Sequence, residues 1–211
     1  RLRWHDLRHD RFADGLDDHP SPSFVEYILE GVTCGFLIDS DTPTVGRGAP
    51  PPNHKSCELA PEEIRKVLRA EVAEGKQVPV PDEIAAYICS SPYGLAVKTP
   101  GPDGKPRYRV VVDMSFPRDG DVQSVNDGCS SADASLRYQV VQRVAELTAL
   151  WGGGALVAAV DLRGGYRQCG VHPSCYTQTG SRFDGQSYVD TRLTFGCRSA
   201  CRVFSCLSEA A

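Results

Sequence analysis

Long apolar runs are missing from this sequence, and none approaches the roughly 20 residues that cross a bilayer. We therefore expect no membrane span and no membrane partner. Residues 1–6 are polar and contain no hydrophobic signal core, which predicts an intracellular protein, cytoplasmic or nuclear. No Cys-x-x-Cys pair occurs, and no internal repeat of roughly 20–50 residues is evident.

The composition is that of a folded protein. The chain has 211 residues, of which 41% are hydrophobic and 24% charged. These fractions exclude a disordered polymer, a coiled coil and a collagen-like rod. The length is sufficient for one or two domains with a substantial core.

Charge is distributed unevenly along the chain. The formal net charge is -4, which taken alone argues against a nucleic-acid partner. Residues 1–89 contain 10 Lys and Arg against 16 Asp and Glu, whereas residues 90–211 contain 13 against 11. Any polyanion is therefore expected to bind the second half.

The cysteines leave two interpretations open. Nine cysteines cannot all form intramolecular disulfides, and without a secretory signal reduced thiols are expected. Packing of free cysteines in the core is one interpretation. The other is a cysteine-rich zinc module, with ligands drawn from Cys197, Cys201, Cys206, His172 and Cys175.

Helical patterns occur in several parts of the chain. Residues 1–20 are polar and predict an irregular entry segment. Ser23 and Glu26 have capping-box spacing before an apolar stripe. Residues 39–57 have loop composition, and Pro61 begins a helix that Gly75 ends.

Further helices are expected later in the chain. Asp133 can cap a helix with one apolar face, which ends at Trp151 and the glycines 152–154. Gly196 is expected to open the last helix.

Strand patterns begin near residue 88. Residues 94–98 and 107–113 flank a segment dense in turn formers and predict an antiparallel hairpin with basic residues near its tip. A second hairpin is expected around Asp184-Gly185. Residues 155–160 form a continuous apolar run that predicts a central strand buried on both faces.

Asp161 closes that apolar run and is the most informative residue of the sequence. A carboxylate is expensive to bury unless it is paired or binds a metal. Asp161 is therefore either a metal ligand or the cap of the next turn.

The sequence resembles the reverse transcriptases. Residues 160–167, Val-Asp-Leu-Arg-Gly-Gly-Tyr-Arg, followed by Val-His-Pro at 171–173, resemble the first catalytic motif of that family. Residues 108–115 with 124–128 resemble the preceding fingers segment, and residues 188–200 resemble a later motif beside template and nucleotide. The match extends over about residues 60–211 and is most similar to DIRS-like retroelements that carry a tyrosine recombinase.

The resemblance implies an α+β fold, the polymerase right hand, with fingers and the first part of an antiparallel palm. It divides the chain into an N-terminal extension at 1–57, fingers at 58–150 and a partial palm at 151–211. The implied function is RNA-directed DNA synthesis in a retrotransposon. The partners would be an RNA or DNA template with its primer and deoxynucleoside triphosphates, and the oligomeric state is not indicated.

The resemblance also implies a magnesium site. Two Mg²⁺ ions can stabilise the attacking and leaving oxygens of nucleotidyl transfer, and Mg²⁺ prefers oxygen ligands. Asp161 would be the catalytic carboxylate and a metal ligand, and the Leu162 carbonyl would supply another oxygen.

Three further positions match residues that hold the nucleotide in the family. The Tyr166 ring would lie under the sugar and exclude a ribose 2′-hydroxyl, or it is a half-buried packing aromatic. Lys98 and Arg109 would hold the triphosphate, or they are solvated strand residues.

The later motif supplies the remaining matches. Phe195 and Gly196 would meet the nucleotide, with Gly196 permitting close backbone approach, although helix initiation also explains a glycine there. Arg198 would contact template phosphate or form a surface salt bridge.

The sequence departs from the family pattern in three places. Gly164-Gly165 replaces a small or acidic residue and Ala, and Cys201 replaces a common Pro. No apolar-x-Asp-Asp motif follows Phe204, which predicts a catalytically incomplete chain. The alternative is a non-catalytic, nucleic-acid-binding remnant of a retroelement.

Overall fold

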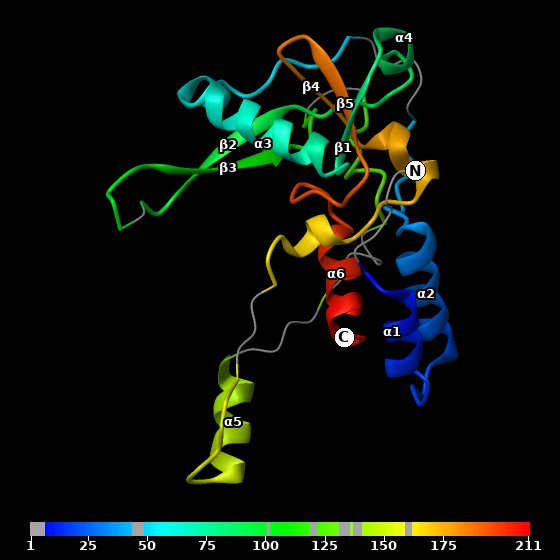
Figure 1. Cartoon of the computed structure of the whole chain (residues 1–211), viewed down its shortest axis with the longest axis vertical. Coiled ribbons are helices and arrows are strands. Elements are labelled where there is room, and N and C mark those ends of the chain that lie inside the picture. The colour runs from blue at the N-terminus through cyan, green and yellow to red at the C-terminus, as the bar shows by residue number, and fades with distance from the viewer. Residues whose placement is uncertain are drawn as a thin grey trace.

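The computed structural model describes residues 7–43, 49–100, 102–118, 122–130, 136, 141–158 and 162–211. Helices and short strands alternate along the chain (Figure 1). The elements are α1 His9–Gly15, α2 Pro22–Cys34, η1 Lys55–Leu59, α3 Pro61–Ala73, β1 Gln77–Val80, α4 Asp82–Ala85, β2 Tyr93–Lys98, β3 Arg107–Val112, α5 Val141–Trp151, η2 Gly165–Gln168, η3 Pro173–Gln178, β4 Gly180–Phe183, β5 Gln186–Asp190 and α6 Ala200–Glu209. The fold is thus a mixture of helices and strands.

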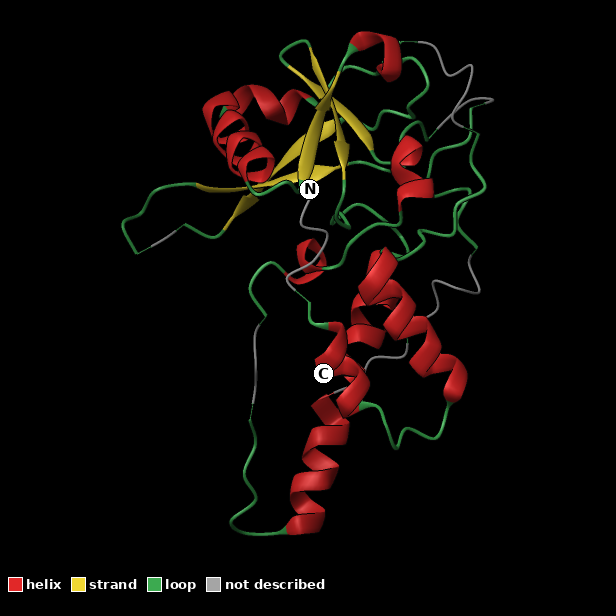
Figure 2. Ribbon diagram, turned by 45° about the vertical axis from the view of Figure 1, so that its right-hand side comes forward, coloured by secondary structure: helices red, strands yellow, loops and turns green. Residues whose placement is uncertain are grey.

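The described strands form two antiparallel sheets, which confirms the antiparallel character expected from the sequence. One sheet has the order β1-β5-β4 and the other pairs β2 with β3. In the first, Gln77 lies opposite Asp190. In the second, Ala96 lies opposite Arg109. Figure 2 shows the strands gathered toward one end of the molecule, with helices beside them and further helices below.

Both predicted hairpins form. The turn between β4 and β5 is made by Asp184 and Gly185, with φ of 49° and 80°, as a tight two-residue turn requires. The β2–β3 hairpin extends away from the rest of the chain (Figure 1) and carries exposed cations, which are Lys98, Lys105, Arg107 and Arg109.

The helix α3 begins with Pro61 in its first turn, as predicted. Its buried residues Ile64 and Leu68 face β1 and β3. The helix α2 also forms, but its N-cap is Ser21 rather than Ser23, and the Ser21 hydroxyl accepts a hydrogen bond from the Phe24 amide at 3.4 Å. Pro22 in the first turn moves the helix start two residues earlier than the capping-box spacing predicts.

The entry segment is more regular than expected. Residues 9–15 form α1, which packs against α2. Leu16 is buried directly after it, and Leu7 and Phe12 pack against the core. The apolar residues are few, so the polar composition concealed the helix.

The predicted central strand at 155–160 is wrong for the residues that the structure describes. Residues 155–158 form no strand, and the Leu156 and Val157 side chains are 92% and 69% exposed. A buried central strand needs a hydrogen-bonded neighbour on each side, and the described strands pair only with one another. Residues 159–161 lie outside the described part.

The helix α5, which precedes this segment, ends at Trp151 as predicted. Asp133, its expected cap, lies outside the described residues. The helix has no buried residue, and Leu150 and Trp151 are 77% and 71% exposed. Figure 1 shows it apart from the two sheets.

All nine cysteines are free thiols, and six of them are buried, namely Cys57, Cys89, Cys129, Cys169, Cys175 and Cys197. Burial raises the pKa of Cys129 to about 11 and that of Cys169 to about 12. These thiols act as packing groups, as one of the two interpretations expected. Within the described ranges, no group of three or more His, Cys, Asp or Glu side chains could hold a metal ion.

No helix in the described part of the chain combines the length and the apolar character that a membrane crossing requires.

Asp113 follows β3 and joins two loops. Its Oδ2 lies 2.9 Å from His54 Nε2 and 2.7 Å from Arg118 Nη1. Partial burial opposes ionisation of the carboxyl, but the hydrogen bonds from Arg118 and His54 outweigh it and lower the pKa of Asp113.

This lowered pKa predicts an acid-sensitive contribution to stability. An ionised Asp113 stabilises the fold fully above the unfolded-state pKa of about 3.9, and the contribution is lost as pH falls through the lower folded pKa. We expect Asp113→Asn to be less stable than the wild type at neutral pH, with a smaller loss on acidification. Urea unfolding over a pH series measures this, with the exposed Asp103→Asn as control. Parallel pH curves for wild type and Asp113→Asn would contradict it.

Candidate nucleotide-binding groove

A groove of about 1230 Å³ opens between β3, η2 and α6. Four residues selected from the sequence meet in it, namely Arg109, Leu162, Tyr166 and Phe195. They come from three separate segments of the chain, since Leu162 and Tyr166 are only four residues apart. The other lining residues are Arg163, Gly164, Gly165, Cys201, Phe204, Ser205, Ser208, Glu209 and Ala211.

Aromatic rings form the wall of the groove. The Tyr166 ring centroid lies 5.1 Å from that of Phe195 and 5.4 Å from that of Phe204. The Arg109 guanidinium carbon lies 5.0 Å from the Phe195 ring centroid, within the range of a cation–π interaction. Phe195 is 44% exposed, so an apolar face and a cation are presented to the groove together.

Tyr166 is half-buried, as one of its two interpretations expects, and its sugar-facing role stays a prediction. Its ring is half-buried against the core, and it also lines the groove. Its hydroxyl lies 2.9 Å from the Cys201 sulfur at the start of α6. The residue that departs from the family pattern at 201 is therefore in contact with the predicted sugar-facing tyrosine.

The two glycines before Tyr166 shape this wall. Gly164 and Gly165 have φ of 79° and 39°, values that residues with a Cβ rarely adopt. They turn the chain directly into η2, which carries Tyr166. The Gly164-Gly165 departure thus has a local conformational reason.

Gly196 lies against the backbone of β3 and is not among the residues that line the groove, so its predicted approach to the nucleotide stays a prediction. A Cβ at this position would lie 1.7 Å from the Val112 carbonyl oxygen in β3. The Asn126 amide donates to the Gly196 carbonyl at 2.8 Å and accepts from the Arg198 amide at 2.8 Å. The prediction that Gly196 opens the last helix is wrong, because these contacts form a turn and α6 begins at Ala200.

Besides Gly196, two further predicted residues lie outside the groove lining. Lys98 is exposed at the end of β2, opposite Arg107. Arg198 is exposed, and its Nη1 donates to the Cys129 carbonyl at 3.3 Å. In the described part of the chain neither lines the groove.

Asp161 lies outside the described residues, so its predicted metal site has no described geometry. Its neighbour Leu162 lines the groove and is 45% exposed. The described ranges supply no cluster of metal-binding side chains, and one carboxylate alone does not fit two Mg²⁺ ions. Magnesium therefore stays a prediction from the sequence.

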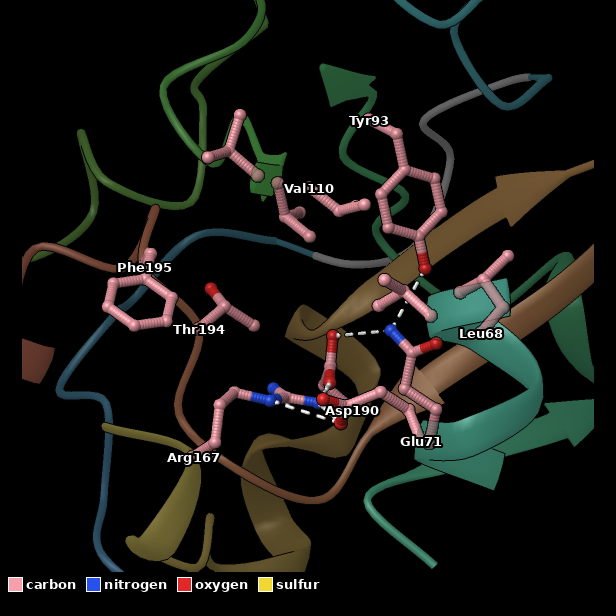
Figure 3. Close-up of a pocket in the computed structure, with 12 residues that line it drawn as sticks. Leu68, Glu71, Tyr93, Val110, Arg167, Asp190, Thr194 and Phe195 are labelled. Atoms are coloured by element: carbon pink, nitrogen blue, oxygen red, sulfur yellow. Dashed lines mark hydrogen bonds and ion pairs between the residues drawn. The ribbon is translucent and has the colours of Figure 1, made fainter. Parts of the chain in front are cut away.

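Sequence reasoning missed two features here. Arg163 lines the groove as a second cation, although it lies inside the segment quoted for the resemblance. Outside the groove lining, Arg167 pairs with Glu71 and Asp190 (Figure 3). Burial raises the pKa of the Asp190 carboxyl, and the Arg167 guanidinium opposes that rise. The sequence signal for this cluster was Asp190, a carboxylate at a buried position of the alternating segment 188–193.

Similar proteins are found among solved structures. No model of a known protein family matches the chain, and no curated protein matches it. Among solved structures it is similar to the native protease-reverse transcriptase of prototype foamy virus, with 19% identity and a TM-score of 0.49 over 79% of this chain.

Two further similar structures are foamy viral protease-reverse transcriptases in complexes. The one with double-stranded DNA has 16% identity and a TM-score of 0.49 over 94% of this chain. The one with an RNA/DNA hybrid has 15% identity and a TM-score of 0.47, also over 94%. The chain spans 19%, 34% and 26% of the lengths of these three proteins.

Proposed function

We propose that the groove binds the incoming deoxynucleoside triphosphate of a reverse transcriptase, and that the chain is part of such an RNA-directed DNA polymerase. The observation that supports this is the convergence of Arg109, Leu162, Tyr166 and Phe195 on one groove. The resemblance of the sequence motifs assigns all four to the nucleotide or its metal.

The chemistry of the groove suits a nucleotide. The rings of Tyr166 and Phe195 offer apolar surface to a sugar and base. Arg109 and Arg163 offer guanidinium groups, each of which can donate two parallel hydrogen bonds to phosphate oxygens. The volume of about 1230 Å³ exceeds the range of roughly 300–1,000 Å³ typical of small-molecule pockets, which leaves room for a strand end beside the nucleotide.

The remaining site residues belong to the same proposal. Asp161 is the metal-binding carboxylate and the Leu162 carbonyl a further oxygen ligand. Lys98 approaches the triphosphate from the hairpin when nucleotide is bound, and Arg198 contacts the template strand. When bound, magnesium supplies charge stabilisation at the phosphates.

Sugar discrimination tests the proposal. With a primer–template duplex present, we expect this chain to bind dATP about tenfold more tightly than ATP, a difference of about 1.4 kcal/mol. Tyr166→Ala should reduce this ratio to about one, because nothing then collides with the 2′-hydroxyl. Tyr166→Phe keeps the ring and should keep the ratio. Isothermal titration calorimetry measures the affinity of each of the three proteins for dATP and for ATP.

The control variant is Tyr87→Ala, because Tyr87 is 61% exposed and does not line the groove. It should leave the ratio unchanged. Equal affinities of the wild type for dATP and ATP would refute the sugar-facing role of Tyr166. If the chain binds the duplex but binds neither dATP nor ATP, the result would instead support the second candidate function.

That second candidate is nucleic-acid binding without catalysis. The exposed cations on the β2–β3 hairpin favour it, because phosphate contacts supply most sequence-independent affinity for nucleic acid.

A further inference from the structure

A buried ion-pair cluster lies outside the groove lining and borders a smaller pocket, which shares Phe195 with the groove (Figure 3). The Arg167 side chain is 12% exposed and lies between Asp190, which is 1% exposed, and Glu71. Arg167 Nη2 is 2.6 Å from Asp190 Oδ1, and Arg167 Nε donates to Glu71 Oε2 at 3.2 Å. Burial opposes the guanidinium charge, but the two carboxylates outweigh burial and raise the pKa of Arg167.

The same guanidinium also binds the backbone that leads to Phe195. Its Nη1 donates to the Arg192 carbonyl at 3.1 Å and to the Leu193 carbonyl at 3.3 Å. Arg167 directly follows Tyr166 in η2. One side chain therefore links the element that carries Tyr166 with the segment that carries Phe195.

A second layer of hydrogen bonds fixes the Asp190 carboxylate. The Gln77 amide in β1 donates to Asp190 Oδ2 at 3.1 Å and to the Tyr93 hydroxyl at 2.9 Å. The Ser181 hydroxyl in β4 donates to the same Tyr93 oxygen at 2.6 Å. Both sheets thus contribute to the position of Asp190, and through it to that of Arg167.

We propose that Arg167, clamped by Asp190 and Glu71, is a positioning residue that sets the distance and angle between the Tyr166 and Phe195 rings for nucleotide binding. This inference rests on the proposed function. A forked guanidinium is needed, because only its separate N–H groups can reach two carboxylates and two carbonyls at once. A lysine ammonium at this position provides the charge but not the fork.

Two variants test the positioning role. Arg167→Lys keeps the charge. Arg167→Met combined with Asp190→Leu replaces the buried pair with apolar groups, an exchange that often preserves stability. We expect both variants to fold with unchanged circular dichroism and to bind dATP on a primer–template about tenfold more weakly, the effect of losing one charge-assisted hydrogen bond.

A ¹⁹F NMR measurement detects a change in the position of the Phe195 ring without any nucleotide present. In protein labelled with fluorophenylalanine, the ¹⁹F resonance of Phe195, assigned with Phe195→Leu, should shift in both variants. The control is the ion pair of Arg182 with Asp82, whose side chains are 3.2 Å apart and do not line the groove. Arg182→Lys should change neither the Phe195 resonance nor the affinity for dATP. An unchanged Phe195 resonance in both variants would overturn the positioning role. A shifted resonance with no dATP binding by the wild type would instead reject the proposed function alone.

Discussion

Asp190→Ala should lower the free energy of unfolding by about 3–5 kcal/mol, the usual cost of removing one partner from a buried ion pair. Asp190 is 1% exposed, and its loss leaves the Arg167 guanidinium buried with Glu71 as its remaining carboxylate. The Gln77 amide also loses an acceptor. Because small proteins are stable by only about 5–15 kcal/mol in total, this variant should populate unfolded chain at room temperature.

Urea unfolding followed by circular dichroism measures the change. Asp82→Ala is the matched control, because Asp82 also pairs with an arginine but is 77% exposed, and exposed pairs contribute about 0–1 kcal/mol. The double variant Arg167→Met with Asp190→Leu should recover most of the loss. A cost below about 1 kcal/mol for Asp190→Ala would show that the cluster does not stabilise the fold.

Gly196→Ala should cost about 3 kcal/mol or more, at or beyond the upper end of the usual overpacking range. The new Cβ would lie 1.7 Å from the Val112 carbonyl oxygen and 2.9 Å from its carbon. Both atoms belong to backbone, so the turn after Phe195 must move away from β3. We also expect weaker nucleotide binding, since Phe195 moves with the turn.

Gly153→Ala is the control for this substitution. A Cβ at Gly153 would meet no atom within 4 Å, so the expected change is within about 0.5 kcal/mol. Urea unfolding of both variants gives the comparison. Equal stabilities would mean that β3 and the turn are not in close contact in solution.

Local chemistry predicted much of the fold. The Asp184-Gly185 turn, the β2–β3 hairpin and the proline start of α3 follow from residues adjacent in sequence, and all three form. Each depends on backbone preferences that a few neighbouring residues determine.

The errors arose where burial depends on distant partners. The run at 155–160 is as apolar as a central strand, yet in its described part Leu156 and Val157 are exposed, because no described strand pairs with them. Gly196 has the pattern of a helix start, but its small size is needed for the contact with Val112.

The candidate site was predictable only where its residues belong to sequence motifs. Arg109, Leu162, Tyr166 and Phe195 came from ordered motifs, and the structure brings them together. The Arg167 cluster joins α3, η2 and β5, and no local pattern relates Glu71 to Asp190. Pairing of this kind emerges only when the elements pack.

The exposure of α5 has a consequence for how unfolding is measured. An isolated helix of fewer than about 12–15 residues is marginal in water, and α5 has 11 residues and buries none of them. Its amide protons should therefore exchange with solvent much faster than those of α3, and Trp151, which it carries, already faces water at 71% exposure. The fluorescence of Trp151 follows this helix and not the core, so a transition read from it reports local fraying, whereas the core unfolds at a different denaturant concentration.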